Sequence, residues 1–259
     1  MVTPAQAKHY REQGYLIVED VFTEGECAEL RRYAAEVVRG EIPLEEGNQI
    51  WMEPDALEQG LTEGDDPEYL FKIGHQMHMS NPVFQKFAAH PNLKAILSHL
   101  VGPDVKCVQS MYLDKPPEVG VGQPYHQDAW YLKTDPDTLM AVWIACDDAM
   151  VENGCLFLVP GSQNDPIYPH EKPIDPKQER LYVEVHSARE RNEQMVSLKT
   201  GSAAFFSGHV LHRSGDNVTE RHRRAYVLHY ADAKSRWLND PKAVNPFLLV
   251  LGQEYPDCL

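Results

Sequence analysis

Short strand-like segments separated by turn signals fill the chain from about residue 105, and they constrain the fold more than any other feature. The segments are rich in β-branched, aromatic and small apolar residues, and Glu152-Asn153-Gly154 is a strong turn between two of them. About eight such segments predict a mainly β fold, a double-sheet jelly roll. The predicted strands are Val105–Leu113, Tyr125–Leu132, Leu139–Cys146, Cys155–Val159, Leu181–His186, Met195–Leu198, Ala203–Phe206 and Ala225–Ala231. Because Leu139–Cys146 is apolar at every position, we expect that strand to be buried on both faces.

The first third of the chain predicts helices, which we expect to flank the jelly roll. Helix-capping residues and glycine stops give their boundaries. The pattern indicates a helix between Thr3-Pro4 and Gly14, a strand at Tyr15–Val18, a helix from the Thr23–Glu26 capping box to Gly40, and a helical stretch from Asn81-Pro82 through Pro91 to Gly102.

The length of 259 residues and the hydrophobic fraction of 42% suit a single domain with a substantial core. We expect that domain to span residues 1–259. It would contain a helical part at about 1–104, a jelly-roll core at about 105–232 and a C-terminal extension at 233–259.

The charge and the apolar pattern exclude several kinds of partner. A net charge of −15 argues against nucleic acid and anionic membranes, which need basic patches. The longest apolar run, Leu139–Cys146, is too short to cross a bilayer, and the amino terminus has no apolar signal core. Five cysteines without a Cys-x-x-Cys pair are typical of a reducing compartment. We therefore expect a soluble cytoplasmic protein that binds a small molecule, and leave its oligomeric state open.

His126-Gln127-Asp128 and a distant histidine suggest a metal site. On an extended segment, residues two apart point to the same side, so His126 and Asp128 can bind one ion. Two histidines and one carboxylate on one face of an iron leave three positions open, as non-haem Fe(II) oxygenases require. A structural zinc site would be closed by four ligands. His209 and His212 are equal candidates for the third ligand on spacing alone.

Arg223 is a second candidate. Period two places Arg223, Ala225, Val227 and His229 on one face of a strand. Inside a barrel, a lone arginine among apolar neighbours needs an anion, and a dicarboxylate would pair with its guanidinium. Equally, Arg223 could continue the exposed basic turn that begins at Arg221.

The stretch Glu41–Glu68 holds ten acidic residues and no lysine or arginine. It could form a lid over the site or a solvated surface loop. As a lid it would repel a substrate that carries several phosphates, although Arg180, Arg189 and Arg191 could offset this repulsion. Lipids, amines, natural products and free acids are therefore all candidate substrates.

The chain resembles the phytanoyl-CoA dioxygenase superfamily of Fe(II)/2-oxoglutarate oxygenases, and within it the phytanoyl-CoA dioxygenase domain-containing proteins. The similar stretches cover most of residues 70–230: Lys72-Ile73-Gly74-His75, Gln109-Ser110-Met111, Pro124 to Ala129, Val142 to Ala145, Glu152 to Leu156, Val159 to Ser162, and His212 to Ala225.

This resemblance implies a double-stranded β-helix that uses Fe(II), 2-oxoglutarate and O2 to hydroxylate a substrate. It implies His126, Asp128 and His212 as catalytic metal ligands, and so favours His212 over His209. It also implies that Arg223 holds the distal carboxylate of 2-oxoglutarate. The family's co-substrate pocket falls on four further residues: Lys72, Met111, Trp143 and Ser214.

Two alternatives from other classes remain. A cupin-like protein could bind a metal or ligand without turnover, but it would have no need of His126, Asp128, His212 and Arg223 together. A zinc hydrolase could use three protein ligands and an activated water, but it would leave Arg223 unexplained. Related halogenases replace the metal-binding carboxylate with a small residue. Asp128 therefore favours hydroxylation.

Overall fold

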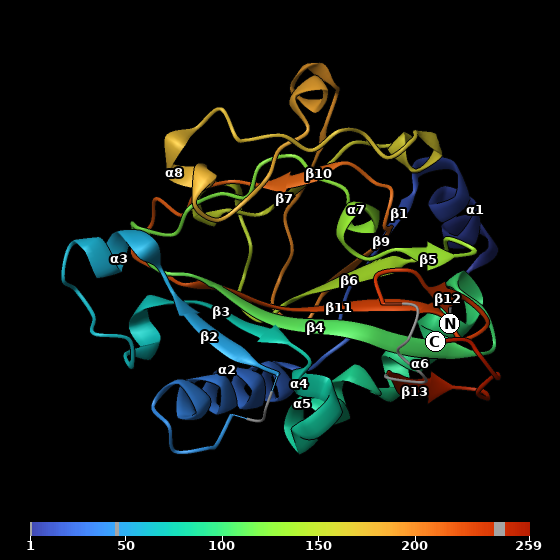
Figure 1. Cartoon of the computed structure of the whole chain (residues 1–259), viewed down its shortest axis with the longest axis horizontal. Coiled ribbons are helices and arrows are strands. Elements are labelled where there is room, and N and C mark those ends of the chain that lie inside the picture. The colour runs from blue at the N-terminus through green and yellow to red at the C-terminus, as the bar shows by residue number, and fades with distance from the viewer. Residues whose placement is uncertain (1, 45–46, 241–246) are drawn as a thin grey trace.

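A computed structural model describes residues 2–44, 47–240 and 247–259 (Figure 1). Met1, Glu45, Glu46 and residues 241–246 lie outside the described residues. Two acidic residues of the Glu41–Glu68 stretch and part of the expected C-terminal extension therefore receive no structural description.

The largest sheet in the described part of the chain has eight antiparallel strands. Seven follow the order β1-β9-β6-β11-β4-β3-β2, and the eighth, β13, pairs with β4. Their bounds are β1 Tyr15–Val18, β2 Gln49–Met52, β3 Leu70–His75, β4 Val105–Lys115, β6 Met140–Ala145, β9 Ala203–Ser207, β11 Arg223–Asp232 and β13 Leu248–Leu251.

A second layer faces this sheet. Its strands follow the order β10-β7-β8, with bounds β7 Leu156–Leu158, β8 Gln194–Val196 and β10 His212–Ser214. In Figure 1, β7 and β10 lie on one side of β6, β11 and β4, while α2, α4 and α5 lie on the other. A short pair, β5 Thr134–Asp135 with β12 Arg236–Trp237, lies apart from both sheets. Two antiparallel layers flanked by helices confirm the predicted mainly β, double-stranded β-helix fold.

Strand β6 is buried at all six positions, as its sequence predicts. Met140, Val142 and Ile144 join the apolar cluster that contains the buried residues of α2, α5 and α6. Ala141, Trp143 and Ala145 join a second cluster between the two sheets. The large sheet therefore carries one core on its helical face and another on the face that meets the small sheet.

The helices begin where their caps predict. Thr3 and Thr23 both form capping boxes, and Gly14 ends the first helix in the left-handed region. The expected helical stretch from Asn81 to Gly102 is two helices. The bounds are α1 Pro4–Gln13, α2 Glu24–Val38, α3 Pro54–Glu58, α4 Met77–Ser80, α5 Pro82–Ala88, α6 Pro91–Leu100, α7 Asp128–Tyr131 and α8 Pro176–Glu179, with 3-10 turns at Pro67–Tyr69, Val151–Asn153, Ser162–Asn164 and His186–Glu190.

Two predicted strands are wrong. Within Tyr125–Leu132, only His126 makes a β-bridge, and the chain turns into α7 at Asp128, where the Leu132 amide donates to the Asp128 carbonyl. Within Leu181–His186, only Glu184 makes a bridge, to Glu171. Conversely, β2 and β3 lie in the part expected to be helical, so the first third does not only flank the jelly roll but also extends its large sheet. Among the described residues, no helix combines the length and apolarity needed to span a membrane.

Candidate metal centre and its cavity

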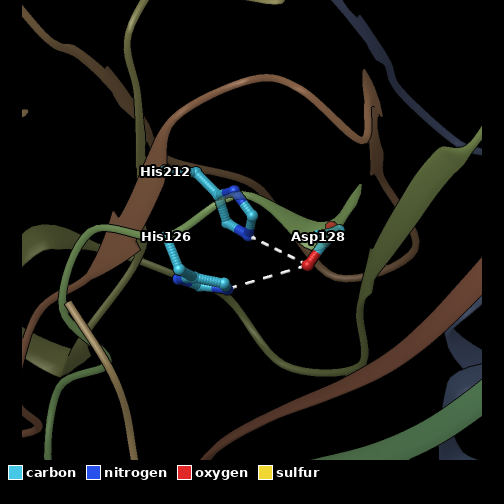
Figure 2. Close-up of side chains that lie close together, drawn as sticks. All are labelled: His126, Asp128 and His212. Atoms are coloured by element: carbon cyan, nitrogen blue, oxygen red, sulfur yellow. Dashed lines mark ion pairs between the residues drawn. The ribbon is translucent and has the colours of Figure 1, made fainter. Parts of the chain in front are cut away.

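His126, Asp128 and His212 converge at the edge of the small sheet (Figure 2). His126 and His212 form an antiparallel bridge, in which each amide donates to the other's carbonyl at 3.0 and 3.1 Å. Gln127 has extended backbone, so the side chains of His126 and Asp128 point the same way. Their ligand atoms all lie within 4.8 Å of one another. Asp128 Oδ1 is 3.7 Å from the Nε2 atom of each histidine.

Backbone carbonyls orient both imidazole rings. His126 Nδ1 lies 2.9 Å from the Pro124 carbonyl, and His212 Nδ1 lies 2.9 Å from the Val210 carbonyl. A carbonyl can only accept, so each Nδ1 carries the proton and each Nε2 presents its lone pair to the centre. The Gln123 side-chain amide nitrogen lies 2.9 Å from His126 Nε2, where it meets the same lone pair that an ion would take, so binding of an ion requires this amide to move aside. The two rings are therefore arranged as metal ligands.

The electrostatics of the triad favour the protonation states that bind a cation. Burial, reinforced by His212, lowers the pKa of His126 to about 3 and keeps that ring neutral. Burial alone would raise the pKa of Asp128, but the facing His212 and His229 side chains outweigh it and lower that pKa below its ordinary value. Two imidazoles and one carboxylate form a donor set that suits Fe(II) and leaves coordination positions open.

A cavity of about 200 Å³ extends from the triad between the two sheets. Arg223, on the inward face of β11, lines it and is only 2% exposed. In the described part of the molecule, Arg223 Nε and Nη1 have no hydrogen-bond partner. Its guanidinium carbon lies 5.2 Å from the Trp143 ring, and burial lowers the pKa of Arg223 to about 10. The alternative of an exposed basic turn is wrong for Arg223.

Lys72, Met111, Trp143 and Ser214 line the same cavity. Lys72 reaches it from β3, with Nζ 4.3 Å from the Trp51 ring centre and 3.4 Å from His75 Nε2. Burial lowers the pKa of Lys72 to about 8. The Ser214 hydroxyl, at the end of β10, accepts from the Gln123 backbone amide at 3.1 Å. The structure thus gathers all eight predicted site residues around one space.

His209, the rival third ligand, points elsewhere. Its Nε2 lies 2.6 Å from Asp137 Oδ2, and its Nδ1 lies 3.1 Å from the Asp165 carbonyl. The hydrogen bond with Asp137 is also what raises the pKa of His209. Spacing alone could not separate His209 from His212, but their partners do.

His229 is a buried site residue to which the sequence gave no role. It lines the cavity from β11 and is 2% exposed, and its Nε2 lies 3.2 Å from Asp128 Oδ2. The period-two pattern that groups it with Arg223 already places it on the inward face. No sequence signal indicated its contact with Asp128.

The acidic stretch is partly built into the body of the protein. Strand β2 pairs with β3, and Arg180 ion-pairs with Asp55 at 3.1 Å and with Glu58, both on α3. Arg189 and Arg191 likewise have carboxylate partners, Glu184 and Asp165. These three arginines are therefore paired within the chain.

The comparisons with known proteins agree with this geometry. Residues 10–225 match the family model for phytanoyl-CoA dioxygenase. This chain belongs to the phytanoyl-CoA dioxygenase family. It is therefore an oxidoreductase of the dioxygenase class. Phytanoyl-CoA dioxygenase domain-containing protein 1 of Rattus norvegicus is 29% identical over 265 aligned residues, which cover 90% of this chain and 91% of the relative.

Among the solved structures, the carbocyclase SnoK from nogalamycin biosynthesis has a TM-score of 0.70 at 22% identity, covering 93% of this chain and 88% of its own. Iron-bound EctD from S. alaskensis has a TM-score of 0.70 at 21% identity, covering 92% and 79%. At these identities the structural likeness shows the shared fold.

Proposed function

We propose that this family member is an Fe(II)- and 2-oxoglutarate-dependent dioxygenase that hydroxylates a small organic substrate. His126, Asp128 and His212 would hold the iron, and Arg223 the distal carboxylate of 2-oxoglutarate. The observation that carries the proposal is that two buried nitrogens of Arg223, Nε and Nη1, have no hydrogen-bond partner among the described residues and lie in the same cavity as the triad. An unpaired buried charge is costly, so its retention indicates an anionic ligand.

When bound, iron and 2-oxoglutarate supply the oxidising power: with O2 they yield succinate and CO2 and place one oxygen atom in a substrate C–H bond. The chain's own residues bind and orient. The two imidazoles and Asp128 leave open positions toward the cavity, and Arg223 offers parallel N–H donors to a carboxylate. Trp143 and Met111 form apolar walls that exclude water, while Lys72 and Ser214 provide further polar contacts.

The proposed substrate is a small molecule in keeping with the cavity volume of about 200 Å³. One structural neighbour, EctD, was solved with 2-oxoglutarate and 5-hydroxyectoine, both small molecules. We also propose that residues 1–259 act as one domain, and that the protein works in the cytoplasm. The four buried free thiols, Cys27, Cys107, Cys146 and Cys155, fit a reducing compartment.

The test is an anaerobic visible spectrum of the apoprotein, titrated with Fe(II) and then with 2-oxoglutarate. We expect a metal-to-ligand charge-transfer band that is absent in His212→Ala and weaker in Arg223→Ala. Iron binding without the band would favour the cupin-like or zinc hydrolase alternatives. Absence of iron binding would refute the proposal. If the band forms, substrates can be screened by succinate release.

A further inference from the structure

The two oxygens of Asp128 have different neighbours. Oδ1 is 3.7 Å from His126 Nε2 and 3.7 Å from His212 Nε2, and so faces the centre of the triad. Oδ2 is 3.2 Å from His229 Nε2, on β11 of the large sheet. One oxygen is therefore available to an ion, while the other is directed at a side chain outside the triad.

His229 is rigidly placed for this contact. Its backbone pairs on both sides, with Gln109 of β4 and Ala141 of β6, and its side chain is 2% exposed. Within the described residues neither ring nitrogen makes a hydrogen bond of good geometry, so nothing competes with Asp128 for Nε2. Contacts of this kind are often long without the metal and tighten when the site is loaded.

From this geometry we infer that His229 is a positioning residue that limits Asp128 to one metal–oxygen bond, an inference that rests on the proposed function. An octahedral ion with three protein ligand atoms has three open positions, two for 2-oxoglutarate and one for O2. If Asp128 bound through both oxygens, one of those positions would be lost. An Nε2–H donated by His229 to Oδ2 keeps the second oxygen off the metal and fixes the carboxylate plane.

Two substitutions separate this role from simple packing. His229→Leu keeps a side chain of similar bulk but removes the N–H donor. His229→Gln keeps an N–H at nearly the reach of Nε2. Val227→Ala, two residues away on the same face of β11, is the matched control for truncation of a buried cavity side chain. Thermal melting of the apoproteins shows whether each variant is folded.

The readouts are the dissociation constants for Fe(II) under anaerobic conditions and for Co(II), each by competition with a chelator. We expect His229→Leu to bind both metals roughly 10- to 100-fold more weakly, because nothing then holds the Asp128 carboxylate in the plane that presents Oδ1 to the ion. His229→Gln and Val227→Ala should stay within about threefold of the wild type, since the first retains a donor and the second leaves Asp128 untouched.

A second readout tests whether the coordination positions for 2-oxoglutarate and O2 remain open on the iron. The 2-oxoglutarate charge-transfer band should weaken in His229→Leu at saturating Fe(II), and succinate release should exceed product formation in that variant. If His229→Leu binds metal as the wild type does, or if the leucine and glutamine variants are weakened equally, the inference is overturned. If the wild type itself binds no Fe(II), both the proposed function and the positioning role of His229 are refuted. Wild-type binding with unchanged variants refutes the positioning role alone.

Discussion

Both faces of β11 bury polar side chains, but the two faces differ in whether those side chains have hydrogen-bond partners. On the outward face, Tyr226 and Tyr230 are fully buried, and their hydroxyls donate to the Phe84 carbonyl at 3.0 Å and the Ala88 carbonyl at 2.8 Å. On the inward face, Arg223 and His229 are 2% exposed, and each keeps nitrogens that make no hydrogen bond to the described residues, although His229 Nε2 lies 3.2 Å from Asp128 Oδ2 at the triad.

This difference separates structure from function within a single strand. A buried polar group with a partner stabilises the fold, whereas one without a partner costs stability unless a ligand completes it. Substitution of Tyr226 or Tyr230 should therefore change the free energy of unfolding, and substitution of Arg223 or His229 should change ligand binding. Arg223 and Tyr230 test that division directly, and Asp128 and Lys72 test the site that the inward face lines.

The largest effect is expected from Asp128→Ala. Two histidines alone provide an incomplete site, so iron binding and product formation should both be lost. Because Asp128 lies on the cavity side, far-UV circular dichroism of the apoprotein should match that of the wild type. An unaltered rate of product formation would rule out Asp128 as a ligand.

Arg223→Met should raise the KM for 2-oxoglutarate by roughly 10- to 100-fold, the cost of losing charged hydrogen bonds to a carboxylate. The melting temperature of the apoprotein should stay the same or rise, because an unpartnered buried charge is replaced by an apolar chain. Steady-state kinetics and thermal melts measure the two effects. A lower melting temperature with an unchanged KM would place Arg223 among the structural residues.

Lys72 gives a dependence on pH. Its pKa of about 8 means that the cavity loses a positive charge as pH rises through 8, so kcat/KM for 2-oxoglutarate should fall by roughly fivefold between pH 7 and 9. The free energy of unfolding should instead rise as the pH is raised. Between pH 8 and 10.5 the unfolded chain holds the Lys72 proton more firmly than the folded one, so deprotonation favours folding there.

Lys72→Met removes the group that titrates, so its kcat/KM profile should be flat over the same interval. A profile in Lys72→Met that falls as steeply as that of the wild type would assign the titration to another group.

The smallest effect is expected on the outward face. Tyr230→Phe removes the donor to the Ala88 carbonyl and should lower the free energy of unfolding by about 1 kcal/mol. The KM for 2-oxoglutarate should not change. Urea denaturation and kinetics at saturating iron test both statements, and a raised KM would show that the two faces are coupled.

The sequence predicted the strands whose pattern is local. β4, β6, β9 and β11 are long or apolar enough to be recognised alone, and α1 and α2 carry their own caps. β2 and β3 were missed because the Glu41–Glu68 region has weak periodicity and β3 depends on pairing with β4, about 40 residues away. Tertiary pairing of this kind overrides local preference.

The candidate site was predictable as far as motif and periodicity extend. Because Gln127 has extended backbone, the Asp128 side chain lies on the same side as that of His126, as the sequence predicts, although the chain turns into α7 immediately afterwards. The contact between Asp128 and His229 joins the start of α7 to β11, about 100 positions apart in the chain, and no local pattern encodes it. The contact between His209 and Asp137 could not be predicted for the same reason.

The position of the triad also links iron supply to the lifetime of the protein. His126 and His212 belong to the edge of the small sheet, while Asp128 contacts β11 of the large one. An ion held by all three ties the two layers together, and its binding free energy adds to the stability of the folded chain. In a cell that is short of iron, more of the protein would be in the less stable iron-free form, which proteases degrade faster. The amount of this enzyme should then fall along with its activity.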